Sequence, residues 1–457
     1  MYDIIIIGAG TAGIAAYKEA IKYTDNILII NEGPWDTTCA RVGCMPSKVL
    51  LSVANRANDI KHADDLSLIV EHTIDTSKVM QHVRSLRDRF TRATIRDVDS
   101  WPEKHKISGK AYFIDSQTIE VNQQAYQAKS FIVAVGSKPT VLPEWKASLG
   151  NKLITSDEIF ELEALPKSLA VLGSGVIAVE LAQAMQRLNV KTTVFARSRR
   201  VGVLSSPNLQ PLAQTELSKE LNFKFQILPE SFRIKDDQVE IHYIENGQKE
   251  VLYADYVLAA TGRTTLLNSV KLENINTEFS NLKQLPLNPE TKQLADLPIF
   301  IVGDAQTTTP VQHEAAHEGR GVVHSCLNFP TVKNVKTLTP LGIAFSSPEM
   351  AMVGQTYKQL TDAQVDFVTG FSSYEKQGRA IVNAKNKGGV ELYVDKQSRQ
   401  LLGAELLTES AEHLAHLLAW CVDDKLTIDE ILKKPFYHPT IEEGLRTALK
   451  HARRQLN

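Results

Sequence analysis

The chain opens with a short apolar run from Tyr2 to Ile7, a glycine-rich turn, and a helical pattern from Ile14 to Lys22. A second apolar run, Asn26 to Ile30, follows at the distance that a βαβ unit requires. This order is typical of a mononucleotide-binding half, because the glycine turn brings backbone N–H groups close to a phosphate. The pattern predicts a nucleotide site at the first turn.

The same pattern occurs a second time. Leu169 to Leu172 leads into a glycine turn and a helical run that ends at Leu188, and Lys191 to Phe195 forms the next apolar run. The two copies are too far apart for a solenoid repeat, so they indicate two separate nucleotide-binding domains. We therefore expect two dinucleotides to bind.

Further apolar and helical stretches complete an α/β pattern. Strands are expected at Phe131 to Gly136, Tyr256 to Gly262 and Ile299 to Asp304, and helical periodicity runs from Ile60 to Asp99. From about Leu338 short strands alternate with helices, with strands at 389–394 and 401–406 and helices at 411–422 and 428–433. We predict an α/β fold with two Rossmann-like dinucleotide-binding domains and a C-terminal α+β domain.

Composition and charge exclude several classes of protein. The 457 residues are 43% hydrophobic and 23% charged, which excludes disordered and fibrous chains. The 51 Lys and Arg against 53 Asp and Glu give a formal charge of −2, so no global field attracts nucleic acid or an anionic membrane. No apolar run reaches the roughly 18 residues of a membrane span. We expect a cytoplasmic protein with neither nucleic acid nor membrane as partner.

The first glycine turn has the spacing of a dinucleotide site. Gly8 permits the tight turn, Gly10 lets a pyrophosphate approach the backbone, and Gly13 allows close packing of the helix. An acidic residue about 20 positions further on usually binds the ribose hydroxyls. Asn31 occupies that place and Glu32 follows it, so either could serve.

The second turn carries Gly173, Gly175 and Ala178. A carboxylate at the end of the following strand favours NAD, whereas an arginine accepts the 2′-phosphate of NADP. Here Arg197 and Arg199 follow the strand and no acid is present. The segment is either a solvated basic turn or an NADPH site, and we favour NADPH over NADH with Arg197 as the first anchor.

Two of the four cysteines lie close together in the segment TCARVGCMPSK, as Cys39 and Cys44. The spacing is too wide for a zinc knuckle, and no second pair completes four ligands. Near a helix start, five residues bring two sulfurs together, and the helix dipole stabilises a thiolate. The pattern therefore indicates a reducible, catalytic disulfide, while Cys326 and Cys421 are expected to be buried thiols.

The block CARVGCMPSK, with GAGTAG upstream and His438-Pro439-Thr440 near the C-terminus, resembles the class I pyridine nucleotide-disulfide oxidoreductases over almost the entire chain. This family includes dihydrolipoamide dehydrogenase, glutathione reductase and mercuric reductase. The resemblance implies an FAD-dependent homodimer. Its domains are an FAD domain in two parts (1–145 and 266–336), an NAD(P) domain (146–265) and a dimerisation domain (337–457).

The resemblance also assigns roles to single positions. Cys44 matches the thiol nearest the flavin and Cys39 the interchange thiol that meets the substrate disulfide. Lys48 matches the lysine near flavin N5, paired with Glu180 of the nicotinamide domain. The other cofactor contacts that the resemblance implies are Thr38, Ala111, Gly136 and Asp304 for FAD and Gly262 for the nicotinamide dinucleotide.

His438 matches the acid-base histidine of the family, and Glu443 the carboxylate that orients it. Thiol-disulfide exchange needs a base to form the attacking thiolate and an acid to protonate the leaving one, and an imidazole can do both near pH 7. In this family the histidine reaches the cysteines of the other subunit. The resemblance thus implies an active site shared between the subunits of a homodimer.

One further motif has a different interpretation. His313 and His317 satisfy the HExxH pattern of zinc proteases. The same stretch resembles the helix after the flavin aspartate in dihydrolipoamide dehydrogenases, so we expect no metal there. Two other functions remain as outsiders, a zinc hydrolase and a non-enzymatic FAD-binding protein. The presence of both cysteines, Lys48 and His438 argues against a protein that only binds FAD.

The resemblance is mixed within the family. Ser47, the HEAAHEG stretch and Val176 resemble dihydrolipoamide dehydrogenases, whereas Ala182 and Arg197 resemble NADPH-dependent glutathione and mercuric reductases. Phe436 stands where lipoamide dehydrogenases usually carry histidine, and no cysteine pair occurs near the C-terminus, as mercuric reductase would need. We predict a dihydrolipoamide dehydrogenase-like enzyme acting on a dithiol or disulfide, the alternative being an NADPH-dependent reductase of a low-molecular-weight disulfide.

Overall fold

The structure is a computed structural model that describes residues 1–306 and 311–456. The chain forms two compact units. The first unit consists of residues 1–46, 84–140 and 263–338, and the second of residues 47–83, 141–262 and the chain from 339 on. Each is described by itself.

The first unit is built on a mostly parallel sheet with β1 at its centre. Ile4, Ile5 and Ile6 are fully buried, as in a strand covered on both faces. The parallel strands are β1 (Tyr2–Ile7), β2 (Ile27–Asn31), β3 (Lys106–Ser108), β6 (Gln124–Val133) and β17 (Ile299–Ile301). Two antiparallel strands, β4 (Ala111–Phe113) and β5 (Thr118–Val121), extend the sheet beyond β6.

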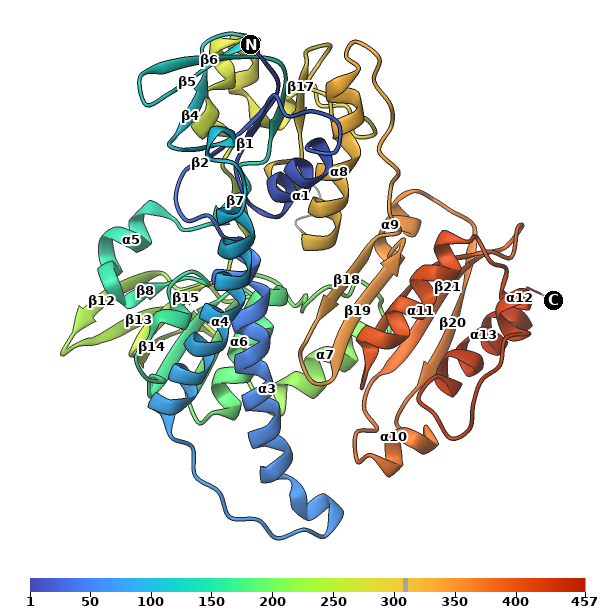
Figure 1. The fold of residues 1–457 in the computed structure, drawn as a ribbon. Helices are drawn as coiled ribbons and strands as arrows, with labels where there is room; N and C mark the ends of the chain where they lie inside the picture. The colour runs from blue at the N-terminus through green and yellow to red at the C-terminus, as the bar shows by residue number, and fades with distance from the viewer. Residues whose placement is uncertain (307–310, 457) are drawn as a thin grey trace. The chain divides into compact units, whose positions relative to one another are not determined.

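Two helices lie side by side on one face of this sheet, α1 (Thr11–Ala20) and α8 (Gln312–Leu327) (Figure 1). A Cβ at Gly319 would lie 2.2 Å from the backbone oxygen of Ala12, so the two helix backbones touch there. Phe113 and Phe131 pack edge to face in the core on the opposite face. The unit also holds α2 (Thr38–Arg41), the start of α3 (Cys44–Lys61), and an antiparallel ribbon of β7 (Ser137–Pro139) and β16 (Arg263–Thr265).

The second unit contains the second nucleotide-type sheet, whose strands are all parallel. Its order is β11 (Asn222–Phe225), β10 (Lys191–Ala196), β9 (Ser168–Leu172), β15 (Tyr256–Ala259) and β8 (Leu153–Ile154). An antiparallel meander follows, made of β12 (Ser231–Lys235), β13 (Gln238–Glu245) and β14 (Gln248–Ala254). The helices of this part are α5 (Pro143–Leu149), α6 (Val176–Arg187) and α7 (Leu209–Ser218), and α4 (Thr76–Asp99) starts in this unit.

The C-terminal part of this unit is an antiparallel sheet covered by helices. Its strands run in the order β18 (Leu341–Ala344), β19 (Glu349–Gly354), β22 (Leu401–Thr408), β21 (Gly389–Asp395) and β20 (Phe367–Ser373). Helices α11 (Ala411–Asp423) and α13 (Glu443–Gln455) lie over one face (Figure 1). Leu392, Leu406 and Leu445 belong to the core between sheet and helices. Shorter helices are α9 (Tyr357–Asp362), α10 (Gly378–Val382) and α12 (Ile428–Leu432).

The predicted fold class is confirmed, and the differences are at element ends. The expected strand from Tyr256 stops at Ala259 and the one from Ile299 stops at Ile301, because Gly262 (φ +121°) and Gly303 (φ +64°) turn the backbone. The helical run expected from Ile60 is interrupted, since α3 ends at Lys61 and α4 begins at Thr76. The domain boundaries stay a prediction.

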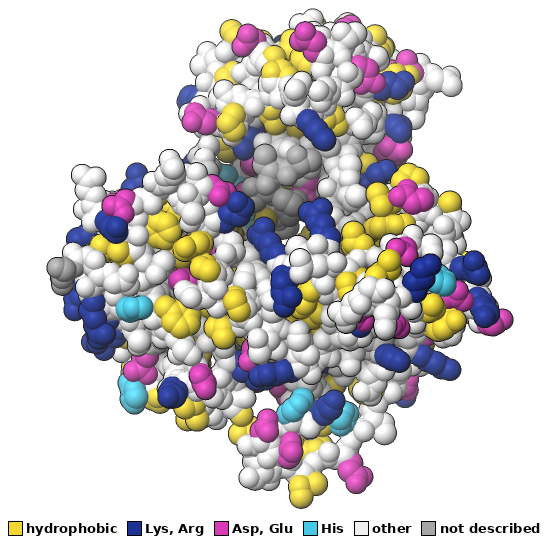
Figure 2. Space-filling model, turned by 180° about the vertical axis from the view of Figure 1, so that it is seen from behind, with side chains coloured by type: hydrophobic (Ala, Val, Ile, Leu, Met, Phe, Trp, Pro, Cys, Tyr) yellow, Lys and Arg dark blue, Asp and Glu magenta, His cyan; other side chains and the backbone are white. Residues whose placement is uncertain are grey.

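The distribution of charged side chains on the surface is consistent with the formal net charge of −2. On the face that Figure 2 shows, Lys and Arg side chains are interspersed with Asp and Glu. Among the helices of the described residues, none is both long and apolar enough to cross a membrane.

Candidate active site

The two cysteines of the redox segment lie on consecutive helices. Cys39 is the second residue of α2 and is half-buried, and Cys44 is the first residue of α3 and is exposed. The connection between them is tight, because a Cβ at Gly43 would lie 3.1 Å from Cα of Cys39. Cys44 therefore stands where the dipole of an 18-residue helix stabilises a thiolate.

Lys48 follows Cys44 one turn along α3 and forms an ion pair with Glu180 of α6. Lys48 Nζ lies 2.8 Å from Glu180 Oε2, and Glu180 is only 3% exposed. The second carboxylate oxygen of Glu180 accepts a hydrogen bond from the backbone N of Phe345, also at 2.8 Å. The ammonium stands 4.4 Å from the centroid of the Phe345 ring, so the Glu180 carboxylate and this ring together fix its place. Nothing in the sequence pattern had marked Phe345.

The first glycine turn is held closed by backbone contacts. A Cβ at Gly8 would lie 2.4 Å from the Ala134 oxygen, and one at Gly13 would lie 1.8 Å from the Gly8 oxygen, whereas one at Gly10 would meet nothing within 4 Å. Asn31 Oδ1 accepts a hydrogen bond from Ala9 N at 2.9 Å. The Asn31 side chain thus holds the turn itself.

The two candidates for the ribose hydroxyls therefore differ. Asn31 is 8% exposed and its amide group also donates to the oxygens of Gly33 and Pro34. The Glu32 carboxylate is exposed and has one distant ion pair, with Lys110 at 4.0 Å. The geometry favours Glu32 as the group that is available to a ligand.

Both glycine turns fit a dinucleotide pyrophosphate. Gly10 and Gly175 are the N-cap residues of α1 and α6 and provide no side-chain cap. Neither helix has an acid in its first turn, so their N–H groups are open to an anion. A Cβ at Gly175 would likewise meet nothing within 4 Å. Gly173 (φ +119°) packs against the Ala260 oxygen, and Ala178 is buried in α6.

Asp304 lies in a small polar group at the end of β17. Its Oδ2 accepts a hydrogen bond from Ser137 Oγ at 2.9 Å and is 3.9 Å from Arg263 Nε, which donates to Ser137 Oγ at 2.8 Å. Gly136 precedes this serine with φ +72°. Sequence reasoning missed Ser137 and Arg263, because only the β7–β16 ribbon brings them to Asp304. Ala111 packs inside the core of the sheet, so only its backbone can face a ligand.

The arginine segment after β10 adjoins the second glycine turn. Ser174 Oγ donates to the backbone oxygen of Arg200 at 2.6 Å, and Gly202 N donates to the oxygen of Ser174. Arg197 is exposed, and the Arg199 guanidinium lies 5.6 Å from the Phe225 ring. Among the described residues none of the three arginines has a carboxylate partner. Gly262 (φ +121°) follows β15, which pairs with β9, the strand that precedes the second glycine turn.

His438 and Glu443 form a pair ahead of α13. Both carboxylate oxygens lie 3.1 Å from Nδ1 of His438, and Glu443 Oε2 also accepts from Thr440 N at 3.2 Å. The hydrogen bond from His438, followed by that from Thr440, lowers the pKa of the Glu443 carboxyl. The His438 side chain is 80% exposed, and in the described part of the chain Nε2 has no hydrogen-bond partner.

The remaining candidates have structural surroundings. His313 and His317 lie on α8, where His317 Nε2 is 2.6 Å from the Lys336 oxygen. Residues 1–306 and 311–456 hold no group of three or more side chains suited to a metal ion. Cys326 is 2% exposed and burial raises its pKa; Cys421, expected to be buried, is only half-buried, and its pKa is also raised by burial.

Two family models match the chain. Residues 2–319 match the model described as pyridine nucleotide-disulphide oxidoreductase. Residues 341–449 match the model of the dimerisation domain of the same group. Between them the two models cover most of the chain.

Curated relatives match along nearly the full length. Dihydrolipoyl dehydrogenase of Geobacillus stearothermophilus is 27% identical over 448 residues, 96% of this chain and 94% of that enzyme. Mercuric reductase of Staphylococcus aureus is 29% identical over 453 residues, 98% of this chain and 82% of that enzyme.

Solved structures share the fold. LpdA from Mycobacterium tuberculosis has a TM-score of 0.85 at 20% identity, covering 100% of both chains. The HOCl-induced flavoprotein disulfide reductase RclA from Escherichia coli has a TM-score of 0.81 at 20% identity, covering 98% of this chain and 99% of that one.

Proposed function

Because the chain belongs to the pyridine nucleotide-disulphide oxidoreductase family, we propose that it is an NADPH-preferring enzyme of the dihydrolipoamide dehydrogenase type. It is an oxidoreductase that acts on sulfur groups, and FAD and a pyridine nucleotide are the cofactors of its family. The observation that carries the proposal is the placement of Cys44 at the start of α3, one turn before a lysine paired with Glu180. Cys39 stands on the preceding short helix, within a five-residue reach.

Residues of the two glycine turns would hold the cofactors. The N-terminus of α1 with Gly10, and the group around Asp304, suit FAD, and the N-terminus of α6 with Gly175 suits the nicotinamide dinucleotide. Bound FAD would supply two-electron transfer between the nicotinamide and the cysteine pair. Lys48, held by Glu180 and Phe345, would place a fixed positive charge in this region.

The cysteines would exchange the disulfide bonds, and His438 would transfer the protons. As a thiolate, Cys39 would attack the substrate disulfide, and Cys44 would then attack Cys39, closing the Cys39–Cys44 disulfide and releasing the second substrate thiolate. The imidazole would take the proton of the attacking thiol and give it to the leaving one. The carboxylate of Glu443 would hold Nδ1–H, which leaves Nε2 to face the sulfur.

We propose a homodimer whose active site is shared. The match of residues 341–449 to a dimerisation domain supports the dimer. The 80% exposure of the His438 side chain supports sharing, because an acid-base residue that is paired with Glu443 but otherwise open to solvent needs another surface to complete its site. We keep the domain boundaries after residues 145, 265 and 336 and a cytoplasmic location as parts of the same proposal.

The preference for NADPH rests on the arginine segment. Arg197 and Arg199 stand beside the second glycine turn through the Ser174–Arg200 contact, and no acid takes the place where NAD enzymes carry one. Planar guanidinium groups suit a 2′-phosphate better than an ammonium does.

The test of the proposed function is the visible spectrum of the purified protein. Adding dihydrolipoamide without oxygen should produce the long-wavelength absorbance of a thiolate beside an oxidised flavin, and the Cys44→Ser variant should lack it. If only NADPH produces the band, the substrate is another small disulfide. A purified protein without flavin would refute the proposal.

A further inference from the structure

One face of α6 carries three buried polar side chains. Glu180, Gln183 and Arg187 are spaced by three and four residues, so they line one side of the helix. Glu180 is 3% exposed, Gln183 1%, and the Arg187 side chain 4%. Buried polar groups are costly unless each finds partners, and all three do.

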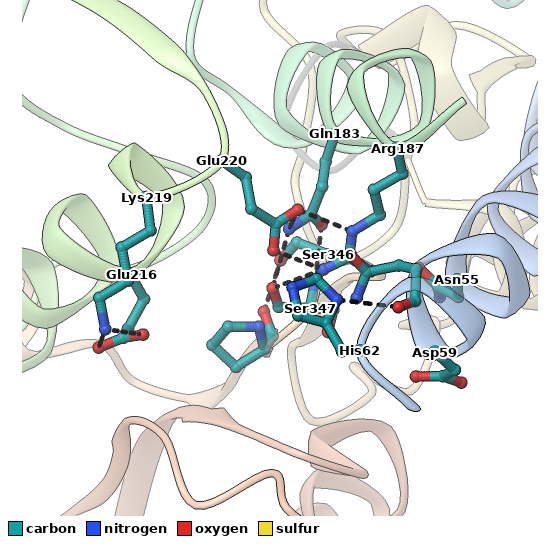
Figure 3. Close-up of polar contacts among 12 residues, drawn as sticks. Asn55, Asp59, His62, Gln183, Arg187, Glu216, Lys219, Glu220, Ser346 and Ser347 are labelled. Carbon is teal, nitrogen blue, oxygen red and sulfur yellow. Dashed lines mark hydrogen bonds and ion pairs between the residues drawn. The ribbon is translucent and has the colours of Figure 1, made fainter. Parts of the chain in front are cut away.

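Gln183 binds the segment that follows Phe345. Its Nε2 donates to the Ser347 oxygen at 2.8 Å, and its Oε1 accepts from Ser347 N at 2.7 Å (Figure 3). Two residues earlier, Phe345 N donates to Glu180. Arg187 Nη2 adds a longer bond to the Ser347 oxygen, at 3.5 Å. Residues 345–347 are thus held to α6 by four hydrogen bonds, which fix the Phe345 ring against the Lys48 ammonium.

Arg187 joins α6 to α3. Its Nε and Nη2 donate to the two carboxylate oxygens of Glu220 at 2.8 and 2.7 Å, and its Nη1 donates to Asn55 Oδ1 at 2.6 Å (Figure 3). The bidentate pair neutralises the arginine and leaves the third donor for Asn55.

The two links between α3 and α6 have the same spacing. Lys48 pairs with Glu180, and Asn55, seven residues later, pairs with Arg187, seven residues after Glu180. Seven residues are two turns, or about 10.5 Å of helix. One link would let α3 turn about Lys48, whereas two links fix both the rotation and the axial position of α3 against α6.

We propose that Asn55, Gln183 and Arg187 form a positioning network that sets the Lys48–Glu180 pair in place beside the flavin, an inference that rests on the proposed function. None of the three needs to touch cofactor or substrate. Asn55 is neutral and its partner Arg187 is balanced by Glu220, so the network acts on Lys48 through geometry and not through added charge.

The experiment compares Asn55→Leu with Asn55→Asp in the FAD-loaded dimer. Asn55→Leu removes the acceptor while Arg187 keeps Glu220, and Asn55→Asp restores an oxygen acceptor. Asn58→Leu is the matched control, because Asn58 lies on the same helix and its side chain makes no hydrogen bond among the described residues. Gln183→Met, which breaks the bonds to Ser347, is a second variant that leaves Asn55 intact.

The readouts are the midpoint potential of the flavin and the rate at which the better nicotinamide nucleotide reduces it. Asn55→Leu and Gln183→Met should shift the potential to more negative values and slow flavin reduction about 10-fold, since small misplacements near a reaction centre have large effects on rate. Asn55→Asp and Asn58→Leu should match the wild type. In a Lys48→Met background, Asn55→Leu should add nothing, because the effect passes through Lys48.

Unchanged potential and rate in Asn55→Leu, with wild-type flavin content, would overturn the positioning role while leaving the proposed function intact. An undiminished effect of Asn55→Leu in the Lys48→Met background would also overturn it. A wild-type flavin that neither NADPH nor NADH reduces would overturn the proposed function, and this inference with it.

Discussion

The Glu443 carboxylate faces Nδ1 of His438 with both oxygens, each at 3.1 Å. Since the hydrogen bond from His438 lowers the pKa of Glu443, this carboxyl keeps its charge throughout the range in which a histidine titrates. The pair therefore presents a ring whose Nδ1 is engaged and whose Nε2 faces outward.

This pairing predicts separate effects on the two half-reactions. His438→Gln should slow dithiol-disulfide exchange about 10²- to 10⁴-fold, the usual contribution of a general acid-base group. Glu443→Gln should slow it less, towards the lower end of that range at about 10²-fold, because the imidazole remains but loses its orienting anion. Stopped-flow reduction of the flavin by NADPH should be unchanged in both.

Glu442→Gln is the control for charge, because it removes a carboxylate one residue away that makes no contact with His438 in the described structure. If Glu442→Gln slows dithiol-disulfide exchange as much as Glu443→Gln does, the effect comes from the loss of negative charge near His438 and not from the hydrogen bond to Nδ1. Equal slowing of flavin reduction would show that His438 is needed for folding and not for exchange.

Arg197 provides the test of nucleotide preference. Arg197→Glu replaces the exposed guanidinium by a carboxylate that repels the 2′-phosphate and can bind the ribose hydroxyls of NADH. We expect kcat/KM for NADPH to fall about 10- to 100-fold and that for NADH to change little or rise. Steady-state kinetics with both nucleotides measure this.

The control for that change is Arg233→Glu, an exposed arginine on β12 that makes the same change in net charge. Equal losses for NADPH and NADH in Arg197→Glu would contradict the assignment of this segment to the 2′-phosphate.

Gly10 and Gly13 should respond differently to the same substitution. A Cβ at Gly13 would lie 1.8 Å from a backbone oxygen that cannot move away, so Gly13→Ala should destabilise the first unit by about 3 kcal/mol or more. Gly10 has φ −76° and open space around it, so Gly10→Ala should fold normally. Its methyl group would occupy the space that a pyrophosphate needs.

Flavin content and thermal unfolding of the flavin-free protein distinguish the two variants. Gly10→Ala should keep the wild-type Tm without flavin and bind FAD more weakly, and Gly13→Ala should lower the Tm. If Gly10→Ala retains full FAD affinity, the first turn is not a pyrophosphate site.

Local sequence patterns were enough to predict the elements around both glycine turns. The unit from β1 to β2 follows from apolar runs and glycine spacing, which depend on neighbours in the chain. The predicted ends of β15 and β17 were wrong. The apolar sequence pattern continues up to Gly262 and Gly303, although the backbone turns there and the strands stop earlier.

The contacts that complete the candidate site were beyond prediction for a different reason. Ser137 reaches Asp304 only after a ribbon forms between distant strands, and Phe345 reaches Lys48 only through the bonds of α6. The choice between Asn31 and Glu32 likewise depended on a hydrogen bond to Ala9 across the turn. Such contacts join residues that are far apart in the chain, so no regular spacing in the sequence indicates them.

Glu349 predicts a pH dependence of stability. Burial raises its pKa to about 7, with the nearby carboxylates of Glu412 and Glu409 adding to the effect, although Glu412 N donates to its Oε2 at 2.9 Å. Between the ordinary value of 4.5 and about 7 the folded protein therefore holds a proton that the unfolded chain has lost. The contribution of Glu349 to the free energy of unfolding must fall as pH rises through this window and stay constant above it.

Glu349→Gln should remove this dependence, because the amide oxygen still accepts from Glu412 N and carries no charge. We expect the variant to be more stable than the wild type at pH 8 by about 1–3 kcal/mol, with the difference vanishing towards pH 4.5. Denaturant unfolding of wild type, Glu349→Gln and the exposed-site control Glu375→Gln, at half-unit steps of pH, measures it. A wild-type curve parallel to that of Glu349→Gln would mean that Glu349 ionises in the folded protein as it does in the unfolded chain.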